Sequence, residues 1–116
     1  TVHTGFNAPC RSFVLKTHIV DLTENTIKAN SRLFKSIDDV PHQAITMGIR
    51  NIMQARRIVL VANGENKAEA LRKTLIDDVT PDVPASILQL HLDISIVADE
   101  AALSLIPDNM CINMNA

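Results

Sequence analysis

The sequence predicts an α/β fold, a mostly parallel sheet flanked by helices, in one unit spanning residues 1–116. Strand and helix patterns alternate along the chain with no linker, internal repeat or low-complexity segment between them, which is typical of βα units. The run 57–62 is continuously apolar after its first residue, as expected for a parallel strand covered on both faces. Two predicted strands pass directly into helices, and ligands bind at such junctions in parallel sheets.

The first part of the chain predicts a strand, a helix, a second strand and a second helix, at residues 17–22, 23–34, 43–48 and 51–55. The first strand alternates apolar and polar side chains. The first helix opens at Thr23 or Glu24, with Asp21 and Thr23 both available as caps. The second strand is short and is expected to be buried.

The second part predicts a strand, a helix, a short helix, a strand and a last helical turn, at residues 57–62, 66–77, 85–90, 94–99 and 100–103. The helix 66–77 is expected to turn Ala68, Ala70, Leu71 and Leu75 inward. Pro81 and Pro84 bracket the turn that follows it. Residues 107–116 have no periodicity, so we expect a frayed tail.

Composition excludes several classes of function. The 116 residues carry 11 Lys and Arg against 13 Asp and Glu, a net charge of -2, and Trp and Tyr are absent. Nucleic-acid binding normally needs a basic face and stacking rings, so we expect no nucleic-acid partner. No apolar run approaches the roughly eighteen residues of a membrane span, so we expect a soluble domain with no membrane partner.

The cysteines and histidines point away from disulfide and metal chemistry. Cys10 and Cys111 lie far apart, with no CxxC spacing and no visible signal peptide. This is typical of free thiols in a reducing cytoplasm, and a disulfide is the less favoured alternative. His18, His42 and His91 have no metal-ligand spacing, so we interpret them as structural or surface residues and expect no metal site.

The turn at residues 62–67 is a candidate ligand site. Gly64 permits close approach of the backbone to a ligand, and Lys67 in the first helical turn can reach a phosphate oxygen. The same pattern is typical of a solvated helix start, because short glycine turns followed by lysine are common.

Two further residues have chemistry that suits a sugar phosphate. Arg32 offers a forked contact to a phosphate, although the row Lys28, Arg32 and Lys35 is also typical of a wet helix face. His3 lies in a loop of small residues that ends at Pro9 and offers acid–base chemistry. A histidine near the start of a chain is also commonly just exposed.

Five segments, in order, resemble motifs of the glucosamine-6-phosphate deaminases: residues 3–9, 15–32, 44–49, 64–70 and 84–91. The resemblance covers nearly the whole chain and corresponds to the C-terminal half of the bacterial enzymes. It implies a Rossmann-like fold and an enzyme of aminosugar catabolism. The family converts glucosamine 6-phosphate and water to fructose 6-phosphate and ammonia, without a metal or an organic cofactor.

The resemblance also implies roles for individual residues. His3 is expected to be catalytic and to assist opening of the sugar ring. Arg32 and Lys67 are expected to bind the phosphate of a hexosamine 6-phosphate, with Gly64 in the turn that approaches the ligand.

Several positions depart from the family pattern. Thr1 and Val2 replace an aspartate and a glycine, and Ala8 replaces the glutamate that orients the histidine, so control of the tautomer is lost. Arg50 stands where a small residue is usual, so it is expected either to crowd the ligand turn or to add a charge to it. Leu92 stands where a proline is usual. The positions of the family's allosteric residues fall at His18 and Val20, which implies that this regulatory site is absent.

Two functions of different classes follow. The first is a deaminase or isomerase of this family, represented by a fragment that has little or no turnover alone, because the family's general base lies in the N-terminal half. The second is a non-catalytic module that binds hexosamine phosphate or pairs with a partner chain. A half sheet leaves an open edge and an uncovered apolar helix face, so we expect self-association through that edge.

Overall fold

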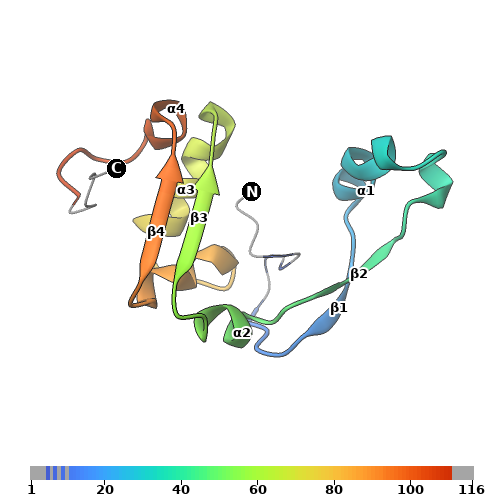
Figure 1. Cartoon of the computed structure of the whole chain (residues 1–116), viewed down its shortest axis with the longest axis horizontal. Coiled ribbons are helices and arrows are strands. Elements are labelled where there is room, and N and C mark those ends of the chain that lie inside the picture. The colour runs from blue at the N-terminus through green and yellow to red at the C-terminus, as the bar shows by residue number, and fades with distance from the viewer. Residues whose placement is uncertain (1–4, 6, 8, 10, 111–116) are drawn as a thin grey trace.

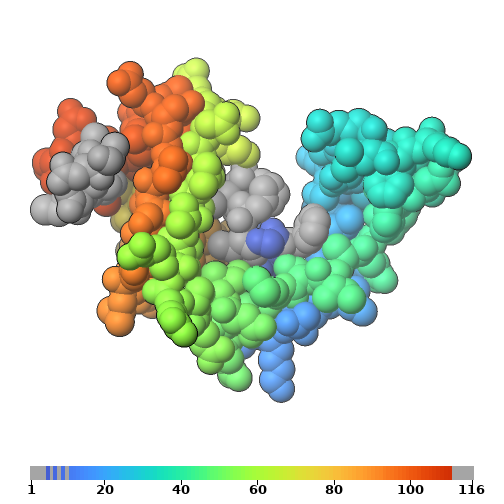
Figure 2. Space-filling view, viewed as in Figure 1, coloured from blue at the N-terminus to red at the C-terminus, as the bar shows by residue number. Residues whose placement is uncertain are grey.

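The computed structural model describes residues 5, 7, 9 and 11–110. The chain forms an arm, residues 18–46, and a body, residues 49–106, which meet at the bottom of the view in Figure 1. Its principal extents are 47 × 30 × 24 Å. In Figure 2 the tip of the arm stands clear of the body.

The body is built on a parallel pair of strands, β3 (Ile58–Ala62) and β4 (Ile94–Ala98). Their register pairs Ile58 with Ile94 and Ala62 with Ala98. The helical elements that connect and follow them are η3 (Glu65–Lys67), α3 (Ala68–Leu75), η4 (Pro84–Leu90) and α4 (Glu100–Leu103). This arrangement confirms the predicted α/β class with a parallel sheet.

The core of the body lies between the strand pair and the helices on one of its faces (Figure 1). Side chains alternate along β3, so Leu60 and Ala62 point into the core while their neighbours point outward. The other buried members of the cluster are Leu71, Ala85, Leu88 and Ala102. Leu71 and Ala102 are fully buried. The predicted inward face of helix 66–77 is therefore correct at Ala68 and Leu71, while Leu75 is half-buried against this core and Ala70 is half-buried without belonging to the cluster.

The opposite face of the strand pair is apolar and bare in the part of the chain that the structure describes. Val59, Val61 and Val97 are 56%, 69% and 57% exposed. The prediction that the apolar run 57–62 is covered on both faces is therefore wrong at Val59 and Val61, because α3, α4 and η4 all pack against the same face. The described residues thus leave an apolar sheet face uncovered, a surface that the sequence did not predict.

The arm is an antiparallel ribbon whose strands are β1 (His18–Asp21) and β2 (Gln43–Thr46). Among the described residues the chain thus has one antiparallel and one parallel pair. The second strand was expected to be buried, yet Ile45 is 73% exposed while Thr46 is buried. A two-stranded ribbon covers only part of its own surface, so its outward side chains stay in solvent.

The tip of the arm carries α1 (Glu24–Asn30), η1 (Ser31–Leu33) and η2 (Ile37–Asp39). Of the two candidate caps of α1, the structure uses Thr23, whose hydroxyl accepts a hydrogen bond from the Thr26 N–H at 3.3 Å. Asp21 instead accepts from Gln43 across the ribbon at 2.7 Å. The α-helix stops at Asn30, before the predicted end, and continues only as the 3₁₀ turn η1.

Arm and body are joined at α2 (Ile49–Met53), which begins and ends two residues before the predicted helix 51–55. The first two N–H groups of α2 are capped by backbone rather than by a side chain. Ile49 donates to the Val14 carbonyl at 2.9 Å, and Arg50 donates to the Leu15 carbonyl at 3.3 Å. The segment before β1 therefore crosses the start of α2 in close contact.

The amino ends of β3 and β4 are tied by polar contacts. Arg57 donates to both carboxylate oxygens of Asp93, at 3.1 and 3.0 Å. The Asp93 N–H donates to Nδ1 of His91 at 3.0 Å, so Nδ1 is the acceptor and Nε2 carries the proton that reaches the Ala55 carbonyl at 2.8 Å. The interpretation of His91 as a structural residue agrees with these contacts.

The chain after α4 forms a turn over residues 107–110, in which Met110 donates to the Pro107 carbonyl at 3.1 Å. The rest of the predicted tail lies outside the described residues. Cys10 and Cys111 lie outside them too, so the two free thiols remain a prediction.

Candidate functional site

The turn that leaves the carboxyl end of β3 is built on a glycine-specific conformation. Gly64 has φ +85° and ψ 153°, a combination that side-chain-bearing residues essentially do not adopt. It changes the direction of the chain between β3 and η3. The backbone of Gly64 confirms the glycine turn that the sequence predicts at this position.

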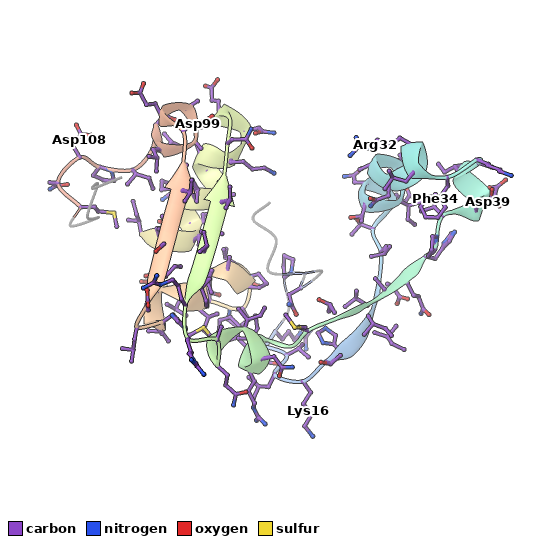
Figure 3. The ribbon with its side chains drawn as sticks, in the orientation of Figure 1. Lys16, Arg32, Phe34, Asp39, Asp99 and Asp108 are labelled. Atoms are coloured by element: carbon purple, nitrogen blue, oxygen red, sulfur yellow. The ribbon has the colours of Figure 1, made fainter. Side chains whose placement is uncertain are left out.

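Asp99 holds this turn from the neighbouring strand end, where Figure 3 labels it. The Gly64 N–H donates to both of its carboxylate oxygens at 3.0 Å. The same carboxylate caps α4 by accepting from the Ala102 N–H at 2.8 Å. The Gly64 N–H is thus committed to Asp99 in this structure.

Sequence reasoning missed Asp99 as part of the site. An aspartate just before a helix is a recognisable cap signal, and that half of its role could have been found. Its second partner lies 35 residues away, and no local pattern indicates such a contact.

Lys67 ends η3 and directly precedes α3, at the carboxyl edge of the parallel pair. It is half-buried, and its N–H donates to the Gly64 carbonyl at 3.0 Å. The position of Lys67 is therefore fixed by the same turn that Asp99 holds. Its placement matches the strand-to-helix junction at which α/β sheets bind ligands.

The next charged groups along α3 neutralise one another. Glu69 accepts from Arg72 at 3.1 Å and lies 3.4 Å from the Lys73 ammonium. The hydrogen bond from Arg72 lowers the pKa of the Glu69 carboxyl, burial opposes this, and the nearby positive charges of Arg72 and Lys73 add to the lowering. Arg72 also pairs with Asp77 at 2.6 Å. These groups form a solvated ion-pair cluster rather than an anion site.

Arg32 lies on η1 at the tip of the arm, where its side chain is exposed (Figure 3). The other predicted phosphate ligand, Lys67, belongs to the body. In the views of Figures 1 and 3 the arm tip and the carboxyl end of β3 stand on opposite sides of the molecule. The structure therefore does not bring Arg32 and Lys67 together.

His3, the predicted catalytic residue, lies outside the described residues, as does Ala8. Two described residues of the same loop show where it contacts the rest of the chain. Asn7 donates through Nδ2 to the Met47 carbonyl at 3.0 Å. Gly5 has φ +68°, and a Cβ added there would lie 2.6 Å from the Thr46 hydroxyl. This part of the loop packs against the end of β2.

A pocket of about 240 Å³ is lined by residues from the first loop, from β1 and from later segments, namely Asn7, Pro9, Ser12, Phe13, Val14, His18, Val20, Ile49, Pro81 and Pro84. Its lining is mainly apolar, with His18 and Ser12 among the polar residues. It includes neither Arg32 nor Lys67, so it is separate from the predicted phosphate ligands. Arg50 is exposed on α2 at the amino end of β3, so it neither crowds nor charges the Gly64 turn at the other end.

The described residues contain no cluster of three or more His, Cys, Asp or Glu side chains arranged to hold a metal ion. Within the same residues, no helix is both long enough and apolar enough to span a membrane.

Sequence comparison identifies related proteins. The family model described as glucosamine-6-phosphate isomerases/6-phosphogluconolactonase matches residues 20–95. The glucosamine-6-phosphate deaminase of Thermoanaerobacter pseudethanolicus is 55% identical over 106 residues, covering 91% of this chain and 42% of that protein. The deaminase of Clostridioides difficile is 53% identical over 102 residues, covering 88% of this chain and 41% of that protein.

Structural comparison agrees with these matches. A solved structure of a monomeric glucosamine-6-phosphate deaminase superposes with a TM-score of 0.78 at 49% identity, over 90% of this chain and 43% of that one. The chain spans about two fifths of the length of the curated relatives it matches. By the match over residues 20–95 and by its fold, the chain belongs to the family of glucosamine-6-phosphate isomerases and 6-phosphogluconolactonases.

Proposed function

We propose that this chain is part of a glucosamine-6-phosphate deaminase and supplies the phosphate-binding side of its active site. The observation that carries the proposal is the glycine-specific turn at the carboxyl end of β3, which Asp99 holds and which leads directly to the half-buried Lys67. The names of the relatives support this substrate class. A dianionic phosphate is well matched by an ammonium at this edge of a parallel sheet.

In this proposal the phosphate of a hexosamine 6-phosphate is bound by Lys67 from the body and by Arg32 from the arm. The guanidinium of Arg32 offers two parallel N–H donors, and the ammonium of Lys67 acts as a point charge. Because the two residues lie on separate parts of the structure, a shared phosphate requires the arm tip and the body to approach each other.

The proposed reaction consumes water and releases ammonia. The sugar ring opens with proton transfer at the ring oxygen, for which His3 is the proposed acid–base residue. A proton then moves from C2 to C1, and water replaces the amine, which leaves fructose 6-phosphate and ammonia. These steps need no metal or organic cofactor.

The general base for the proton transfer between C2 and C1 belongs to the part of the family sequence that precedes this match. We therefore expect the 116-residue chain to bind the sugar phosphate and to release little or no ammonia by itself. A cytoplasmic location is proposed with this function, since the substrate is a phosphorylated metabolite.

Alanine substitution of the two cations tests the proposal. Arg32→Ala and Lys67→Ala are each expected to weaken glucosamine 6-phosphate binding by roughly ten- to a hundredfold, because each removes a charge-assisted hydrogen bond. Isothermal titration calorimetry on the full chain measures the affinity.

Matched controls are available on the same surfaces. Lys73→Ala removes an exposed cation of α3, and Lys35→Ala removes one beside η1. Both are expected to change the affinity by less than about twofold, as distant surface charges are screened. Unchanged affinity in both Arg32→Ala and Lys67→Ala would exclude the proposed site.

The bare strand face favours a second candidate function, a non-catalytic module that pairs with another copy. Val59, Val61 and Val97 form a contiguous apolar surface on the strand pair, and such surfaces promote association. Sedimentation velocity is expected to show concentration-dependent dimers that Val61→Lys abolishes and Val79→Lys preserves. A monomer at all concentrations would rule out this function.

A further inference from the structure

Asp99 makes more contacts than a helix cap requires. Capping of α4 uses only the contact from the Ala102 N–H to Oδ1 at 2.8 Å. The same carboxylate also accepts the Gly64 N–H on both oxygens at 3.0 Å. One side chain at the end of β4 therefore joins the start of α4 to the turn after β3.

The backbone geometry of Gly64 connects the Asp99 contact to Lys67. With φ +85° and ψ 153°, Gly64 directs its N–H toward β4 and sends the chain into η3. Its carbonyl then accepts the Lys67 N–H at 3.0 Å. A contiguous set of bonds thus runs from Asp99 through Gly64 to the backbone of Lys67.

We propose that Asp99 is a positioning residue that sets the location of Lys67 for phosphate binding. The inference rests on the proposed function for the role of Lys67, while the contacts of Asp99 stand independently of it. Asp99 is not a ligand in this proposal, because a carboxylate repels a phosphate. Its contribution is geometric, and the charge of the carboxylate is expected to be dispensable.

Two substitutions of Asp99 distinguish its contact with the Gly64 turn from its negative charge and from its capping of α4. Asp99→Asn removes the charge but keeps Oδ1, which already contacts both the Gly64 and Ala102 N–H groups. Asp99→Ser remains a good helix cap, but its shorter side chain cannot also span the distance to Gly64. Serine therefore removes the link to the turn while α4 stays capped.

The experiment combines amide NMR spectra of the full chain with titration of glucosamine 6-phosphate. In Asp99→Ser we expect the Gly64 amide to exchange at least about tenfold faster, because its hydrogen bond is lost. The Lys67 amide is expected to shift, and the affinity to fall about tenfold. Asp99→Asn is expected to stay within about twofold of the parent chain in both exchange and affinity.

The possible outcomes are distinct. If Asp99→Ser leaves the Lys67 resonances in place, or frees the Gly64 amide without lowering the affinity, the positioning role is overturned. If Asp99→Asn loses as much affinity as Asp99→Ser, the charge matters and the geometric role is wrong. If the parent chain does not bind the sugar phosphate, the proposed function fails, and the Gly64 and Lys67 resonances still decide whether Asp99 positions Lys67.

Discussion

Replacing Gly48 with alanine is expected to destabilise the chain by about 3 kcal/mol, at the upper end for a single added methyl group. A Cβ at this position would lie 2.2 Å from the Leu15 carbonyl oxygen and 2.4 Å from the Lys16 carbonyl oxygen. Both obstacles are backbone atoms, which cannot swing aside as a side chain can. The segment before β1 would have to move away from α2.

The backbone of Gly48 makes this a test of space alone. Its φ of -72° and ψ of 160° suit any residue, and at such positions alanine ordinarily stabilises by reducing the entropy of the unfolded chain. Because the added methyl group has no room, Gly48→Ala is expected to destabilise the chain instead of stabilising it. The displacement would also break the hydrogen bonds that cap α2 at Ile49 and Arg50.

Urea unfolding followed by circular dichroism measures the loss. Met47→Ala is the matched control, since this neighbour is 55% exposed and its truncation is expected to cost less than about 1 kcal/mol. A Gly48→Ala chain as stable as the parent would contradict the close crossing of residues 15 and 16 over α2.

Replacing Gly64 with alanine is expected to lower the free energy of unfolding by about 2 kcal/mol and to weaken sugar-phosphate binding. The cause here is backbone strain, whereas at Gly48 it is a steric clash. Sterics are a minor factor here, because among the described residues a Cβ would meet only the side-chain Oδ1 of Asn66, at 3.2 Å, which needs to shift by a few tenths of an ångström. The penalty comes from φ +85° with ψ 153°, which forces a side chain against its own backbone. Relief of that strain would turn the N–H away from Asp99 and move Lys67.

Gly64→Asn sharpens this test. Asparagine tolerates the left-handed helical region near ψ +47°, but ψ 153° lies far outside it. Asparagine is therefore expected to destabilise about as much as alanine, as measured by urea unfolding and calorimetric titration. If asparagine restored the stability of the parent chain, the Gly64 conformation would be an ordinary left-handed turn and the explanation would be wrong.

Local signals in the sequence predicted the features that depend on near neighbours. Thr23 as a cap, the glycine turn after β3 and the inward face of α3 each follow from residues within one or two helical turns. The family motifs indicated the fold class and the relatives. Element ends were less well predicted, as at Asn30, where the α-helix gives way to a 3₁₀ turn.

The features that local patterns could not predict depend on contacts between distant segments. The link from Gly64 to Asp99 spans 35 residues, and the crossing of Leu15 over Gly48 spans 33. The apolar run 57–62 predicted a buried strand, but a local pattern does not show whether helices of this chain cover one face of that strand or both. Motif order likewise placed Arg32 and Lys67 in one site, although their separation depends on the direction in which the arm leaves the body.

The contacts at the two ends of the parallel pair have a consequence for strand slippage. Shifting one strand by a single residue would exchange its two faces and place Val59 and Val61 against the helices, an exchange that apolarity alone does not forbid, since both faces are apolar. Arg57 with Asp93 fixes the pairing at one end, and Gly64 with Asp99 fixes it at the other. These polar contacts thus select one alignment where hydrophobic patterning alone leaves two.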